Sequence, residues 1–312
     1  MITRVSTVNM SRDEWLDKRR LTIGGSDAAA ILGLSEYSSP YYVWAEKTGK
    51  VIPEDISDKE AVRLGNDLED YVAKRWSEKT GKKVRRDRAF IYNSDYPFAH
   101  ANIDRAVVGE DAGLECKTTS SYEIAAQLEE GIIPKHWYCQ MVHYLMITGA
   151  KKWYLAALVF GKGFYTLEVD RDDAEILALA TAEQAFWHNV TSNTPPNLDG
   201  SEATQEALRT ILKDSIDSSV DLTGVSNHLF LYAQLKERIK EMEKELAEHQ
   251  AYIMQYMGSA AKGTYDKYSV SYRTQYRRNF DREAFERVYG PISATFFKET
   301  TSRPFKLTVK KI

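Results

Sequence analysis

Five short runs in the middle of the chain are continuously apolar or alternate between apolar and polar residues, as β-strands do. They span residues 84–93, 98–108, 113–117, 152–160 and 164–169. Helical patterns precede them at 11–20, 27–32, 40–48 and 59–80, interrupt them at 134–148, and follow them at 172–190. Helices followed by a small sheet that contains an inserted helix predict an α/β fold, with a central mixed sheet flanked by helices.

A proline- and glycine-containing segment at 191–201 is the clearest boundary in the chain. We therefore expect a core over residues 1–195 and a C-terminal extension over 196–312, with a long helical segment, a β-hairpin at 263–275, a basic helix and a last strand. Apolar residues recur in the helical segment about every 3.5 positions, which indicates a coiled-coil or hairpin seam, although ordinary packing is the commoner cause. They are Leu235, Ile239, Met242, Leu246, Ile253 and Tyr256.

The charge of the chain is unevenly distributed. The formal net charge is −3, yet residues 258–312 carry 12 Lys and Arg against 5 Asp and Glu. Such a basic end can contact a polyanion or can be a solvated face. Two cysteines are too few for a disulfide framework, and no apolar run approaches the roughly 18 residues of a membrane span. Without a recognisable secretory signal, we expect a cytoplasmic protein that does not contact membranes.

The segment Leu114-Glu115-Cys116-Lys117 carries an acid and a base in a predicted strand. Side chains two residues apart share a face, so Glu115 and Lys117 point one way while Leu114 and Cys116 enter the core. Asp104, eleven residues before Glu115, can lie on the adjacent strand of one hairpin. This carboxylate cluster is costly to desolvate unless a hard cation such as Mg²⁺ or Mn²⁺ balances it. A surface ion pair and a turn-capping Asp are the ordinary alternatives.

Two helical stripes contain one polar residue that looks out of place. Glu69 lies among Gly65, Val72 and Trp76, and Gln140 lies among Trp137, Tyr144 and Ile147. A buried amide has to be hydrogen-bonded, and an active site offers such partners. Both stripes therefore point toward the same candidate site as Asp104 and Glu115.

These motifs together resemble a known family. Asp104 followed by Glu115-Cys116-Lys117 resembles the Asp…Glu-x-Lys signature of restriction-endonuclease-like nucleases. Gly65-x-x-x-Glu69 and Gln140-x-x-x-Tyr144 narrow the resemblance to the lambda-exonuclease group, the YqaJ-like viral recombinases. The N-terminal motif of that group is matched by Trp15, Arg19, Ile23, Gly25, Ser26 and Asp27. One departure is that Asn102-Ile103 stands where the pattern usually has a proline before the Asp.

The resemblance implies a role for each matching residue. Asp104, Glu115 and the backbone carbonyl of Cys116 are expected to bind metal, and Lys117 to position or activate the attacking water. Glu69 is expected to complete a second metal site. The remaining implied residues contact DNA: Arg19 and Ser26 at the 5′-terminal phosphate, and Gln140 near the scissile phosphate.

The implied activity is a Mg²⁺- or Mn²⁺-dependent exonuclease that degrades one strand of linear duplex DNA from its 5′ end and leaves 3′ overhangs for phage-type recombination. Two cations about 3.5–4 Å apart can stabilise both the attacking and the leaving oxygen. The resemblance also implies a homotrimer on DNA ends and a single-strand annealing protein as partner. Two alternatives are a structure- or site-specific endonuclease and a non-catalytic end-binding adaptor.

Overall fold

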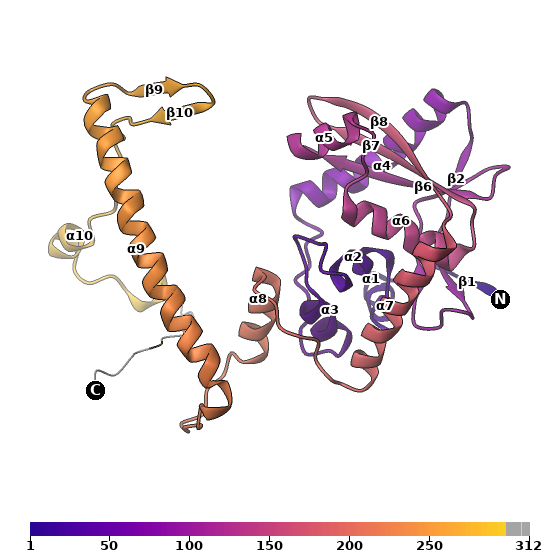
Figure 1. The fold of residues 1–312 in the computed structure, drawn as a ribbon, viewed down its shortest axis with the longest axis horizontal. Helices are drawn as coiled ribbons and strands as arrows, with labels where there is room; N and C mark the ends of the chain where they lie inside the picture. Colours follow the sequence, from indigo (N-terminus) through magenta and orange to yellow (C-terminus); the bar gives the residue numbers. More distant parts are fainter. Residues whose placement is uncertain (298–306, 308–312) are drawn as a thin grey trace. The chain divides into compact units, whose positions relative to one another are not determined.

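The computed structural model describes residues 1–297 and 307, and the chain divides into two compact units, Met1–Lys213 and Asp214–Ile312. The first unit contains a five-stranded sheet in the order β2-β5-β6-β7-β8 (Figure 1). Within it β6 and β7 run parallel and the other neighbours are antiparallel. Its strands are β2 (Val84–Arg86), β5 (Arg105–Val107), β6 (Ala112–Thr119), β7 (Lys152–Val159) and β8 (Gly163–Asp170). The predicted α/β fold with a central mixed sheet is confirmed.

A second sheet, in the order β1-β3-β4, corrects two of the predicted strands. It contains β1 (Ile2–Ser6), β3 (Ala89–Asn93) and β4 (His100–Ala101), so the runs 84–93 and 98–108 are each divided between two sheets. The chain turns at 102–104, where the Asn102 side chain donates to the carbonyl of Ala89 at 2.9 Å. Strand β1 was not predicted, because all five of its residues are exposed and a strand without a buried face shows no alternation of apolar and polar residues.

Helices cover both faces of the central sheet. On one face α4 (Glu60–Thr80) places Val72 and Trp76 against Leu114 of β6 and Tyr154 of β7. The other face packs against α6 (Lys135–Thr148), which with α5 (Tyr122–Glu129) connects β6 to β7. Leu114 and Cys116 belong to the α4 side, as the predicted alternation requires. The remaining helices of the unit are α1 (Arg12–Arg20), α2 (Gly25–Ile31), α3 (Pro40–Lys47), α7 (Asp173–Thr191) and α8 (Glu202–Ile211).

The first unit continues past the boundary expected at residue 195. Helix α8 packs on α3, where Ala207 is fully buried and the Thr204 hydroxyl donates to the Ser39 hydroxyl at 2.7 Å. The proline-containing segment is therefore a connection within the unit. Its proline and glycine residues are equally typical of a linker, and no local pattern indicates that α8 packs on α3.

The C-terminal unit begins with η1 (Thr223–Val225) and the 32-residue helix α9 (Ser226–Met257). A hairpin of β9 (Lys262–Tyr265) and β10 (Tyr268–Ser271) follows at the end of that helix, and then α10 (Arg282–Tyr289) and η2 (Ala294–Phe296) (Figure 1). The predicted last strand falls in 298–312, where residue 307 alone lies among the described residues. None of the helices that the structure describes has both the length and the apolar character needed to span a bilayer.

Candidate active site

The candidate site is a hollow of about 280 Å³ along an edge of β6. Strand β5 pairs with β6 at Arg105↔Leu114 and Ala106↔Gly113, so the ladder stops before Glu115. Beyond that point the backbone N–H of Cys116 donates to Oδ2 of Asp104 at 2.8 Å in place of a strand partner. The hollow is lined by Gly65, Asn66, Glu69, Val72, Asp104, Glu115, Cys116, Lys117, Thr118 and Gln140. All the residues predicted for catalysis or metal binding thus lie together.

Asp104, which is half-buried, and Glu115, which is buried, form a pair of carboxyl groups. Burial, followed by the negative charges of Glu115 and Glu69, raises the pKa of Asp104 well above its usual value. Glu115 is 2% exposed, and its Oε2 has no hydrogen-bond partner among the described residues. A buried carboxylate oxygen without a partner is costly. Within the part of the chain that the structure describes, Lys117 is the one cation that faces these two carboxyl groups in the hollow, so the unpartnered oxygen of Glu115 fits a hard divalent cation, which Asp104, Glu115 and the Cys116 carbonyl could hold.

Lys117 supplies the one ammonium group of the hollow, and its position is fixed by two partners. Its Nζ lies 2.5 Å from Oε1 of Glu115 and donates to Oε1 of Gln140 at 2.8 Å. Burial acts to lower the pKa of Lys117, but the charges of Glu115 and Asp104 outweigh it, and the pKa is raised. Lys117 is therefore a positive charge beside the two carboxyl groups.

Gln140 connects this lysine to an aromatic side chain. Its Nε2 donates to the hydroxyl of Tyr144 at 2.8 Å while its Oε1 accepts from Lys117. Both halves of the amide are satisfied, which explains a glutamine on an otherwise aromatic and apolar stripe. Tyr144 is 4% exposed and its ring centroid lies 5.2 Å from that of Trp153, so the row from Glu115 to Tyr144 ends in the core.

Glu69 lines the hollow but is paired with Arg105, a residue that the sequence did not single out. Arg105 is 3% exposed, and its guanidinium donates to Oε1 of Glu69 at 2.5 Å, to Asp70 at 2.6 Å and to the carbonyl of Asp104 at 2.7 Å. Among the described residues, no three His, Cys, Asp or Glu side chains are grouped as ready metal ligands. The carboxylates therefore converge without forming a closed coordination shell. The only sequence feature that could have indicated a role for Arg105 in the site is its position next to Asp104.

Arg19 and Ser26, the residues predicted for the terminal phosphate, lie side by side. The Arg19 guanidinium donates to the Ser26 hydroxyl and lies 3.6 Å from Asp27. Lys47, whose side chain is fully buried, pairs with Asp27 at 2.8 Å. Burial would raise the pKa of Asp27, but Lys47 and Arg19 outweigh it and hold the pKa well below its usual value. Lys47 and Arg19 thus face the Asp27 carboxylate, and Glu46 lies within electrostatic range of all three.

The first turn of α2, which contains Ser26, packs against Tyr144, the tyrosine that is hydrogen-bonded to Gln140. A Cβ added at Gly25 would lie 2.6 Å from Cε1 of Tyr144, closer than real side chains allow. Gly25 is therefore required for the close approach of α2 to α6. The Arg19–Ser26 corner and the carboxylate hollow are thus held by a common element.

A buried histidine braces the strand that leads toward Asp104. His143 and Glu183 are both fully buried, with Nδ1 2.7 Å from Oε1 of Glu183 and Nε2 2.8 Å from the carbonyl of His100. Burial acts to lower the pKa of His143, but the charge of Glu183 outweighs burial, and the pKa of His143 is raised. At His100 burial lowers the pKa to about 3. No local pattern in the sequence indicates this pairing across 40 residues.

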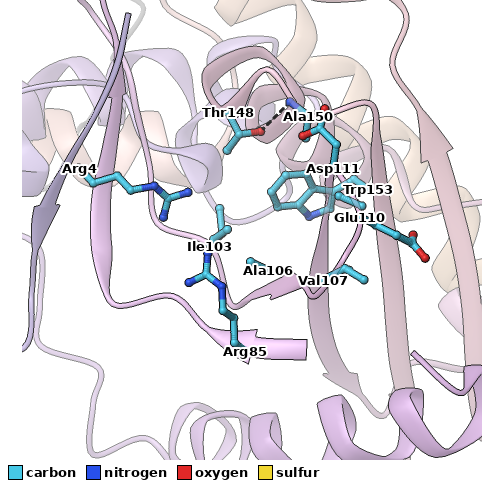
Figure 2. A pocket seen from close by; sticks show the side chains of 11 residues that line it. Arg4, Arg85, Ile103, Ala106, Val107, Glu110, Asp111, Thr148, Ala150 and Trp153 are labelled. Atoms are coloured by element: carbon cyan, nitrogen blue, oxygen red, sulfur yellow. Dashed lines mark hydrogen bonds between the residues drawn. The ribbon is translucent and has the colours of Figure 1, made fainter. Parts of the chain in front are cut away.

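A second hollow, of about 200 Å³, lies near the first residues of β6 and β7 (Figure 2). Arg4 of β1 and Arg85 of β2 extend into it, and Trp153 forms one wall. Both arginines are within 4.0 Å of Asp87. None of the residues predicted for the site lines this hollow, so we place the candidate chemistry in the hollow beside Glu115.

Comparisons with known proteins agree with the sequence motifs. A family model described as the YqaJ-like viral recombinase domain matches residues 14–151. The uncharacterized protein YqaJ of Bacillus subtilis (strain 168) is 38% identical over 301 residues, which are 95% of this chain and 94% of that protein.

Among solved structures, the alkaline exonuclease LHK-Exo from Laribacter hongkongensis matches with a TM-score of 0.50 and 18% identity, over 58% of this chain and 94% of its own. The LHK-Exo complex with dAMP gives the same values. At this identity the likeness shows the fold alone, which is the restriction-endonuclease-like fold.

Proposed function

This chain belongs to the YqaJ-like viral recombinase family, and from that premise we propose that it is a metal-dependent exonuclease. It would degrade one strand of linear duplex DNA from the 5′ end and leave 3′ overhangs for phage-type recombination. The observation that carries the proposal is the carboxyl pair of Asp104 and Glu115 beside the Lys117 ammonium, with one Glu115 oxygen lacking a partner among the described residues. This arrangement suits phosphodiester hydrolysis.

Asp104, Glu115 and the carbonyl of Cys116 would hold Mg²⁺ or Mn²⁺, with Glu69 as a further ligand if it exchanges its partner Arg105. A bound divalent cation supplies a more acidic water and compensates negative charge on the phosphate. The ammonium of Lys117 places a fixed positive charge where the phosphate gains negative charge, and it needs no reorganisation because Gln140 and Glu115 already hold it.

The corner formed by Arg19, Ser26, Asp27 and Lys47 would bind the 5′-terminal phosphate. Arg19 offers donors that match phosphate oxygens, and the buried Asp27–Lys47 pair fixes the position of its head group. Because this corner and the hollow share Tyr144 as support, an end bound at Arg19 would be held at a fixed position relative to Asp104.

Further properties follow from family membership as proposals. They are two cations per site, a homotrimer that binds duplex ends, a single-strand annealing protein as partner, and a location in the cytoplasm of a bacterial host. None is needed for the chemistry proposed at Asp104 and Glu115.

The test is digestion of end-labelled linear duplex DNA with Mg²⁺, comparing 5′-phosphate with 5′-hydroxyl ends. Lys117→Ala should slow release of labelled nucleotides by about 10²–10³-fold, the usual loss when one preorganised charge is removed. Lys151→Ala is the matched control, because that side chain is exposed and outside the hollow. Arg19→Ala should reduce the preference for phosphorylated ends.

A Lys117→Ala enzyme that digests DNA at the wild-type rate would remove the proposed site. Cleavage of covalently closed circles as fast as linear DNA would favour an endonuclease of the same fold. End binding with no hydrolysis by the wild type would favour the adaptor.

A further inference from the structure

The apolar seam of α9 is uncovered in the C-terminal unit. No residue of this 32-residue helix is buried, and the described residues of its own unit leave the stripe exposed. The exposed fraction of the seam side chains lies between 47% and 95%. They are Leu235, Ile239, Met242, Leu246, Ile253 and Tyr256. The helix is about 48 Å long at 1.5 Å per residue, and an apolar stripe of that extent marks a protein interaction surface.

The seam follows a heptad without a break. Ile239, Leu246 and Ile253 occupy position a, and Leu235, Met242, His249 and Tyr256 occupy position d. Two of the three a residues, Ile239 and Ile253, are β-branched, as is common in two-stranded parallel coiled coils. His249 is the polar residue of the seam, and such a residue favours a single register because it pairs with its own copy.

The flanking charges distinguish one pairing from the others. In a parallel, in-register dimer a g residue faces the e residue five positions later on the second helix. Arg238 at g thus faces Glu243 at e, and this attraction occurs twice by symmetry. The next such pair, Glu245 with Gln250, brings no like charges together. In the antiparallel arrangement that pairs Met242 with Leu246, Glu243 and Glu245 would each lie close to their own copies, which is repulsive.

We propose that α9 forms a parallel two-stranded coiled coil with α9 of a second copy of this chain. The proposal is independent of the nuclease chemistry. The two-fold contact between α9 helices is separate from the homotrimer that is proposed above from family membership. It would place the two hairpins formed by β9 and β10 at the same end of the coiled coil, because the hairpin directly follows α9 in each copy.

Disulfide trapping in the full-length protein tests this pairing without relying on overall mass. Met242→Cys places a thiol at a d position, where it meets its own copy in a parallel dimer. Lys244→Cys is the matched control, because position f lies on the opposite side of the helix. Under mild oxidation Met242→Cys should convert to a covalent dimer on a non-reducing gel at least about tenfold faster than Lys244→Cys. Equal conversion of the two variants would overturn the proposal.

Charge reversal tests the register in a second way. Arg238→Glu and Glu243→Arg, each introduced alone into the Met242→Cys protein, should slow trapping by about tenfold because attraction becomes repulsion at two symmetric positions. The double reversal should restore it, since the complementary pairs are re-formed. Failure of the double reversal to restore trapping would exclude the parallel register. Unchanged DNA digestion in all these variants would leave the proposed function standing.

Discussion

Asp104→Asn should stabilise the protein in the absence of divalent cations, although it should abolish activity. The carboxyl group lies near Glu115 and Glu69, and its desolvation together with those charges raises its pKa well above the usual value. Ionised Asp104 is therefore unfavourable in the folded protein until a cation binds. The amide oxygen of Asn can still accept the hydrogen bond from the Cys116 N–H, so the variant removes the charge and keeps the contact.

The sign and size of the effect follow from proton linkage. Because the pKa of Asp104 is higher in the folded than in the unfolded chain, its contribution to stability is fully present below the unfolded value and is lost as pH rises through the folded value. The wild type should lose at most about 1.4 kcal/mol per pH unit relative to the variant in that window. At neutral pH we expect a gain of about 0.5–2 kcal/mol, as is usual when a destabilised functional group is neutralised.

A bound cation should reverse the order of stability. Mg²⁺ at 100 times its dissociation constant stabilises the wild type by about 2.7 kcal/mol, and the variant should lose most of that gain. Urea unfolding followed by tryptophan fluorescence reports the first unit alone, because all six tryptophans lie before Lys213. The comparison needs EDTA and Mg²⁺, each at low and at neutral pH.

Asp67→Asn is the matched control, since Asp67 is exposed on the same helix as Glu69. It should change stability little and should keep the Mg²⁺ effect. An Asp104→Asn protein that is less stable than the wild type in EDTA at neutral pH would refute the reasoning about the carboxyl pair. Equal stabilisation of both proteins by Mg²⁺ would refute the assignment of Asp104 as a metal ligand.

Two further substitutions test the supports of the site. Gly25→Ala should lower the free energy of unfolding by about 1–3 kcal/mol and slow DNA digestion, because the new methyl group would lie 2.6 Å from the buried Tyr144 ring. Gly65→Ala is the control, since its added atom meets an ordinary 3.6 Å contact, and it should leave the free energy of unfolding unchanged or raise it by about 0.5–1 kcal/mol. A Gly25→Ala protein as stable as the wild type would show that α2 and α6 can separate. Arg105→Met should destabilise the protein by about 1–3 kcal/mol, since it leaves Glu69 without its buried guanidinium partner. The midpoint of urea unfolding measures this loss, with the exposed Arg85→Met as control. Equal midpoints for the two variants would show that Arg105 does not stabilise the site.

Local chemistry was enough to predict most elements of the core. Ser11 and Glu14 form the capping box that begins α1, and Gly81 in the left-handed region ends α4 at the expected place. The two-residue alternation of β6 correctly separated Leu114 and Cys116, which pack against α4, from Glu115 and Lys117. These features depend on neighbours a few residues away, so they are written directly in the sequence.

Contacts between distant segments were decided by the tertiary structure. The runs that became β2 with β3, and β4 with β5, look continuous in sequence, but pairing with different partners divides them between two sheets. The partners of Glu69 and Asp27 are Arg105 and Lys47, 36 and 20 residues away, and no local periodicity links them. The sequence alone determined which side chains could act and which face of a strand they share. Only packing decided which charges neutralise one another, because burial acts on groups that the fold brings together and not on groups adjacent in the chain.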